Sequence, residues 1–127
     1  MKVKVGSTYI CDGPDRSAGK WTGPIGSFPR SLDEMTQIQP VLRGAAKAIF
    51  DRGNLHNTFR LVVQKLHSDA DSAHATIFTL ASLAGTITFE YGATGSKAMT
   101  GIARLKGLDA DGLTVRAEWE LIGGAIT

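Results

Sequence analysis

Alternation of apolar and polar residues predicts β-strand over much of this chain. The most regular case runs from Leu113 to Ile122, where apolar residues take every second position. A period of two places alternate side chains on opposite faces of a strand. We therefore expect one face of this strand to be buried and the other to be solvated. The buried face would hold Leu113, Val115, Ala117, Trp119 and Leu121.

The same period predicts further strands. Lys2–Ile10 reads as one first strand, with Val3 and Val5 on its apolar face. Asn57–Leu66 is a second long strand, and Gly85–Tyr91 is another, with Ile87, Phe89 and Tyr91 facing one way. Lys97–Leu108 is a strand of small residues, curved or kinked near Gly101. The apolar face of the second strand would hold Phe59, Leu61 and Val63.

Turn residues separate these strands. Residues 51–54 (Asp-Arg-Gly-Asn) predict a hairpin between a strand at Ala46–Phe50 and the strand from Asn57, because Gly and Asn tolerate positive φ. Residues 92–96 and 109–112 predict two more turns. Leu32–Leu42 fits either a short helical turn or an edge strand, since a proline in it disfavours a central strand.

The period changes once, to that of a helix over about residues 69–84. Ser68 and Asp71 fit an N-terminal capping box, and Asp69 and Asp71 suit the positive end of a helix dipole. Gly85 stands where a C-terminal glycine cap belongs. An apolar stripe at three- and four-residue spacing would face the sheet. It consists of Ala73, Ile77, Leu80, Ala81 and Ala84.

Residues 11–31 follow neither period and are rich in proline and glycine, which predicts a long loop. Structureless loops of about 20 residues in a compact domain are usually functional or disordered. Trp21, Ile25 and Phe28 are spaced apolar anchors in it. They either tuck the loop against its own domain or pack on a neighbouring subunit, as large aromatics on adaptable segments do.

Together these elements predict one α+β domain, residues 1–127, that is mainly β: an antiparallel β-sandwich or barrel-like sheet flanked by one helix. The last five residues would be a short flexible tail, with Ile126 as a further candidate for subunit contact. We expect the core to include Phe59, Leu61, Val63, Ile77, Leu80, Phe89, Val115 and Trp119.

Composition excludes several classes of function. A net charge of +2 without a dense Lys/Arg run argues against specific nucleic-acid binding. Cys11 is the only cysteine, so no intramolecular disulfide is possible. The N-terminus lacks the continuous apolar region of a signal peptide, and no apolar run approaches the roughly 18 residues that span a membrane.

No catalytic, cofactor or metal motif is evident. The three histidines, His56, His67 and His74, do not have the spacing of a zinc site, and no cysteine pair supports one. Residues 109–112 lack the later ligands of a calcium loop, and residues 92–97 lack the spacing of a phosphate loop. Cys11 has no histidine motif beside it. We expect no enzyme activity, no cofactor and no metal.

Five short segments of the chain form one pattern: residues 52–55, 58–63, 66–68, 85–89 and 119–126. In this pattern an Arg-Gly-Asn turn leads into a phenylalanine-bearing strand, a helix, a glycine and an apolar strand. The last segment reads Trp-x-Leu-x-Gly-Gly-Ala-Ile. The pattern resembles that of small phage and prophage tail proteins. The likeness covers about residues 48–127 and excludes the Pro/Gly-rich loop.

The resemblance implies a non-enzymatic subunit of a tail tube or distal tail that assembles into homo-oligomeric rings and contacts other tail proteins. Its place would be the virion tail, after assembly in the host cytoplasm. The alternative is a monomeric or dimeric module that recognises a protein or glycan through the 11–31 loop. Arg60, Arg104 and Arg116 alternate with apolar positions, so they line either a solvated sheet face, or an inter-subunit or channel surface.

Overall fold

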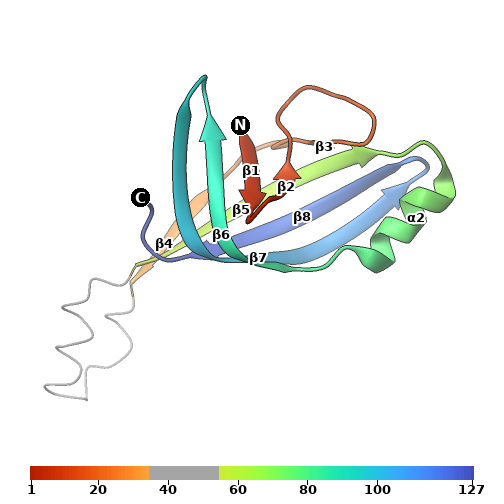
Figure 1. The fold of residues 1–127 in the computed structure, drawn as a ribbon. Coiled ribbons are helices and arrows are strands. Elements are labelled where there is room, and N and C mark those ends of the chain that lie inside the picture. The colour runs from red at the N-terminus through yellow and green to blue at the C-terminus, as the bar shows by residue number, and fades with distance from the viewer. Residues whose placement is uncertain (35–54) are drawn as a thin grey trace, which may run out of the picture.

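The computed structural model describes residues 1–34 and 55–127 of the protein. These residues form a strongly curved sheet with helix α2 (Ala70–Thr79) at one end (Figure 1). The strands are β1 (Lys2–Val5), β2 (Thr8–Cys11), β3 (Trp21–Thr22), β4 (Arg30–Glu34), β5 (Leu55–Leu66), β6 (Leu83–Tyr91), β7 (Gly95–Asp111) and β8 (Thr114–Gly123).

The sheet is antiparallel and runs in the order β2-β1-β6-β7-β8-β5-β3, with β4 also paired to β5. Its two ends meet just beyond β2. The Asp12 N–H donates to the Trp21 carbonyl at 2.7 Å, and the Gly23 N–H donates to the Gly13 carbonyl at 2.9 Å. These bonds nearly close a barrel. The predicted class, mainly β with a barrel-like antiparallel sheet and one helix, is confirmed.

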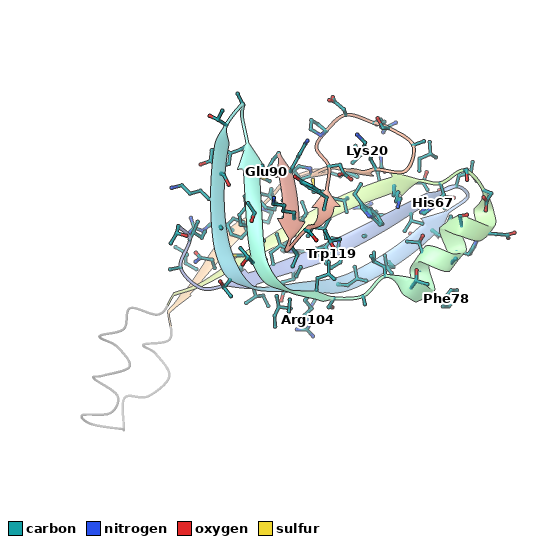
Figure 2. All side chains as sticks on the ribbon, in the orientation of Figure 1. Lys20, His67, Phe78, Glu90, Arg104 and Trp119 are labelled. Carbon is teal, nitrogen blue, oxygen red and sulfur yellow. The ribbon has the colours of Figure 1, made fainter. Side chains whose placement is uncertain are left out.

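The core lies inside this barrel and follows the alternation of its strands. On β8, Val115, Ala117, Trp119 and Leu121 are buried as predicted, whereas Leu113 precedes the strand and is 43% exposed. On β5 the buried positions are Phe59, Leu61 and Val63. In Figure 2, Trp119 points into the barrel and Arg104 points out of it. Tyr91, predicted to share a face with Ile87 and Phe89, is 44% exposed at the end of β6.

A row of glycines marks the sharpest bend of the sheet. Gly85, Gly101 and Gly123 stand directly opposite one another on β6, β7 and β8. A Cβ at Gly101 would overlap the Ile122 carbonyl oxygen and come within 2.6 Å of the Gly123 Cα, so the backbones approach too closely there for a side chain. Figure 1 shows the hairpin of β6 and β7 turning away from the direction of β8. The predicted kink near Gly101 is this bend.

Helix α2 is shorter than predicted. Asp69, rather than Ser68, is its N-cap and accepts a hydrogen bond from the Ser72 N–H at 2.7 Å. This bond and the bonds that the Ser72 and Ser68 hydroxyls donate to Asp69 hold the pKa of its carboxyl below the usual range. Thr79 is the last helical residue and Leu80 is the C-cap. Gly85 belongs to β6 instead of capping the helix. Pairing of Leu83 and Ala84 with β7 ends the helical pattern early.

The helix contributes less to the core than its stripe predicted. Ala73 is fully buried, Leu80 packs against the core, and Ile77 is half-buried. The neighbouring Phe78 is 84% exposed and points away from the barrel (Figure 2). The helix contacts β7 and β8. The short helix therefore covers one end of the barrel rather than a full face of the sheet.

Both chain ends also differ from prediction. Residues 2–10 form a hairpin of β1 and β2, not one strand, because Gly6 adopts a φ of 61° and reverses the chain. The last residues are bonded to β7: the Thr127 N–H donates to the Ala98 carbonyl at 2.9 Å, and the Ala98 N–H donates back at 3.0 Å. The tail is thus a short edge segment of the sheet.

Two predictions near the middle of the chain lie outside the described residues. These are the strand at Ala46–Phe50 and the turn at residues 51–54. Of the segment Leu32–Leu42, only residues 32–34 are described, and they belong to strand β4. This part therefore follows the edge-strand alternative.

Candidate interaction surface

The 11–31 loop is fixed to its own barrel at Trp21. Trp21 belongs to β3, is 9% exposed, and pairs with Lys65 of β5. Its backbone N–H donates to a carboxylate oxygen of Asp12 at 2.8 Å, and the Lys65 ammonium lies 5.5 Å from its ring centroid. A residue held on both sides in this way contributes to barrel closure and leaves little surface for a partner.

A second anchor is an aromatic cluster inside the barrel. Phe28 stacks on Phe59 with ring centroids 5.2 Å apart, and Phe59 meets Phe89 at 4.9 Å. Between the two anchors, the Ile25 N–H donates to the Val62 carbonyl at 2.8 Å. Trp21, Ile25 and Phe28 thus all contact their own domain. The longest exposed stretch of the loop is residues 14–20.

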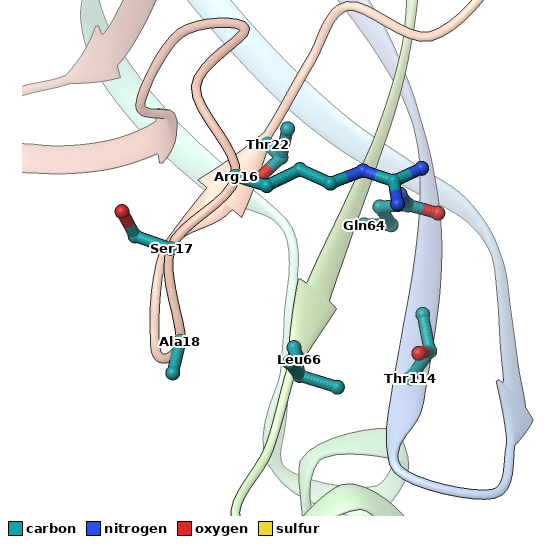
Figure 3. Close-up of a pocket in the computed structure, with 7 residues that line it drawn as sticks. All are labelled: Arg16, Ser17, Ala18, Thr22, Gln64, Leu66 and Thr114. Atoms are coloured by element: carbon teal, nitrogen blue, oxygen red, sulfur yellow. The ribbon is translucent and has the colours of Figure 1, made fainter.

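The exposed part of the loop borders a small cavity of about 180 Å³ (Figure 3). Arg16 extends over it toward Gln64, while Ser17 and Ala18 lie at its other side. The remaining lining residues are Thr22, Leu66 and Thr114. Pockets for drug-sized ligands are usually about 300 Å³ or larger. The cavity is therefore too small to hold more than a few atoms of a partner.

At the opposite end of β5, strand β4 forms an edge of the sheet. It pairs with β5 from Arg30 opposite Phe59 to Glu34 opposite Leu55. Within residues 1–34 and 55–127, no strand pairs with its other edge. Leu32 stands opposite the buried Asn57 and hence on the inner face of the sheet, yet it is 55% exposed. Leu32 is thus an exposed apolar side chain on the inner face of the sheet.

Asn57 joins this edge to the C-terminal segment. It is 2% exposed, and its side-chain oxygen accepts a hydrogen bond from the Arg30 guanidinium at 2.6 Å. Its side-chain nitrogen donates to the Gly124 carbonyl at 2.5 Å. The guanidinium also lies 5.6 Å from the Phe59 ring centroid. Ile126, the second-last residue, packs against the core. One buried amide therefore fixes β4 and the tail together.

The outer face of β5, β8 and β7 carries a ladder of charged side chains. Arg60 and Glu118 form an ion pair at 2.8 Å, and Lys106 lies 3.8 Å from Glu120. Exposed pairs of this kind contribute about 0–1 kcal/mol each to stability. The ladder is therefore a property of the surface rather than a source of stability. It comprises Arg60, Arg104, Lys106, Arg116, Glu118 and Glu120.

The chemically reactive residues are three histidines and Cys11, and they lie on different segments of the chain. His67 contacts Thr76 at 3.2 Å, and burial followed by the nearby Lys65 lowers its pKa. His74 contacts the Ala70 carbonyl of its own helix at 2.7 Å, and His56 lies on β5 opposite Asp33. Cys11 is buried at the end of β2. Across the described ranges, no group of three metal-ligating residues comes together.

In the part of the chain that the structure describes, no helix is long and apolar enough to cross a membrane. Comparison with protein-family models, with curated proteins and with solved structures gives no match. The likeness to phage tail proteins accordingly stays a prediction.

Sequence reasoning missed the burial of Asn57. Asn57 was predicted to begin a strand, where a polar residue usually indicates a solvated end, so its burial had no signal. The edge position of β4 was one of two alternatives at residues 32–42, and the proline in that segment was the available signal.

Proposed function

We propose that this protein is a non-enzymatic structural subunit of a phage or phage-like tail that assembles into rings or a tube with copies of itself and with other tail proteins. The observation that carries the proposal is the charged ladder on the outer face of β5, β8 and β7. A barrel that buries its apolar residues internally, and presents long polar strands outward, is complete as a unit and can be repeated side by side. Its site of action would be the virion tail.

Three further features support a repeating subunit. The exposed loop residues 14–20 extend from the barrel, and β4 offers an unpaired edge among the described residues. Extended segments and sheet edges are the elements through which subunits commonly bind neighbours. No group of three metal-ligating residues comes together in the described ranges, which fits a structural role better than metal-dependent catalysis.

The second candidate is a monomeric or dimeric binding module. The cavity beneath Arg16 favours this binding module, because a polar group of a bound protein or glycan could enter the cavity beside the exposed loop. The small size of the cavity and the fixed position of Trp21 limit what this loop can adapt to. For these reasons we rank it second.

Negative-stain electron microscopy of the purified protein tests the first candidate. Rings or tubes are expected at micromolar to millimolar concentration. Arg104→Glu should reduce the assembled fraction, because it adds an acid opposite Glu120 in the ladder. Lys97→Glu makes the same charge change on β7 outside the ladder and should assemble normally. Discrete particles of single-subunit size at every concentration would refute the proposal.

A further inference from the structure

The cavity beside the exposed loop has the outer face of the sheet as its floor. Thr22 of β3 stands opposite Gln64 of β5, and two residues further along β5, Leu66 stands opposite Thr114 of β8. Side chains directly opposite, or two apart on one strand, share a face of the sheet. Two hydroxyls and one amide of this floor therefore line the cavity. Because β5 has 12 residues, the floor lies about 36 Å along the strand from Leu55.

The loop supplies the wall of the cavity and is fixed to the end of β5. Ala18 forms a parallel bridge with Leu66, and the Gly19 N–H donates to the Leu66 carbonyl at 3.0 Å. The Lys20 N–H donates to the Ser17 carbonyl at 3.3 Å and closes a turn. The wall is thus held in place before anything binds, which lowers the entropy cost of binding.

The lining of the cavity carries a positive charge and no negative one. Arg16 extends over the floor, and its guanidinium lies beside the Gln64 side chain (Figure 3). Among the described residues no carboxylate lines the cavity, and none forms an ion pair with Arg16. The neighbouring Asp15 lines a different hollow, beside the turn between β6 and β7. This charge favours an anion, and a guanidinium presents its N–H donors in a fork that fits phosphate oxygens.

Thr22 gives a second, independent indication. It is 9% exposed, and its hydroxyl has no hydrogen-bond partner within residues 1–34 and 55–127. Buried polar side chains are rarely left without a partner. Because Thr22 lines the cavity, a ligand held there by Arg16 can accept a hydrogen bond from this hydroxyl.

We propose that the cavity binds a phosphate group, either as the free ion or as the monoester of a larger molecule. Its volume of about 180 Å³ admits a group of this size but not a drug-sized ligand. Arg16 would bind two of the phosphate oxygens, while the Thr22 hydroxyl and the Gln64 amide donate to the others. A carboxylate has only two oxygens and would leave more of these donors unused. The inference goes beyond the tail proposal and does not depend on it.

NMR titration of the full-length, ¹⁵N-labelled protein with inorganic phosphate at constant ionic strength tests the site. Saturable shifts are expected at the amides of residues 16–19, 22, 64 and 114, with half-saturation at about 1–10 mM. Shifts that do not saturate, or that sodium chloride reproduces, would overturn the inference, and so would acetate that binds as tightly as phosphate. Glycerol 2-phosphate separates the two sources. Tighter binding than phosphate supports a monoester, and equal or weaker binding supports the free ion.

Matched variants test the residues. Arg16→Gln should weaken phosphate binding about tenfold or more, because it removes the charged donor. Arg104→Gln makes the same change opposite Glu120, six residues along β8 from Thr114, and should leave the affinity within about twofold. Thr22→Val keeps the shape of the side chain and should weaken binding about threefold or more, with thermal unfolding as the check on folding. Equal losses in the two arginine variants would show a response to overall charge and overturn the inference.

Discussion

At the scale of single residues, Asn57 should be among the most sensitive positions of the chain. Its buried amide satisfies both the Arg30 guanidinium and the Gly124 carbonyl. Asn57→Ala removes both hydrogen bonds, which together contribute about 1–3 kcal/mol at about 0.5–1.5 kcal/mol each. We expect the free energy of unfolding in urea to fall by that amount, and amide exchange in residues 124–127 to speed up.

The adjacent Thr58→Val is the matched control, since Thr58 lies on the opposite face of the same strand. It should change the free energy of unfolding by no more than about 0.5 kcal/mol. If both variants lose the same stability, the amide does not fix the tail.

At the scale of elements, the glycine row should tolerate no side chain at Gly101. Gly101→Ala places a methyl group against the backbone of β8, which cannot withdraw without breaking the pairing of Gly101 with Gly123. We expect a loss of at least about 3 kcal/mol, the upper range for overpacking, measured by thermal or urea unfolding. Gly107→Ala on the same strand meets nothing within 4 Å and should be neutral or slightly stabilising. Equal effects would contradict a steric role for the row.

The elements also show which parts of the fold can be predicted from the sequence. Strands with strict alternation, β5 and β8, were predicted to within a few residues because one face of each is buried along its length. The helix was predicted too long, since Ala81 and Ala84 fit its stripe equally well whether helical or extended. In the structure Ala84 pairs with Ile102 of β7, so this end of the stripe is extended rather than helical. Glycines 85, 101 and 123 are far apart in sequence, and only the strand register brings them into one row.

At the scale of the whole molecule, the barrel-like alternative was predicted but its closure was not. Closure depends on a few backbone bonds between the ends of an irregular loop, near Asp12–Gly13 and Trp21–Gly23, and no periodicity marks such bonds. The sequence therefore left open whether the loop packs on its own domain or on a neighbouring subunit, whereas the anchored part of the loop belongs to the barrel wall. The candidate contact residues of that loop were found by their size and spacing, and these properties suit an internal anchor equally well.

Cys11 offers a direct measure of this closure. It is fully buried at the end of β2, its thiol lies 3.4 Å from the Met1 carbonyl, and burial raises its pKa. The thiol therefore stays protonated as the pH rises through about 8.5, where an exposed thiol ionises. We expect iodoacetamide to label the folded protein slowly over this whole pH range. Fast labelling of the folded wild type would show that the barrel is open at β2.

Asp12→Ala removes the carboxylate that accepts the Trp21 N–H, and hydrogen bonds to charged groups contribute about 1.5–3 kcal/mol. Because labelling requires the junction to open, the rate at Cys11 should rise about tenfold or more. Asp15→Ala removes an exposed acid from the same loop and should leave the rate unchanged. A rate that rises in the first variant alone would locate barrel opening at the β2–β3 junction. Equal rates in the two variants would place the opening elsewhere in the barrel.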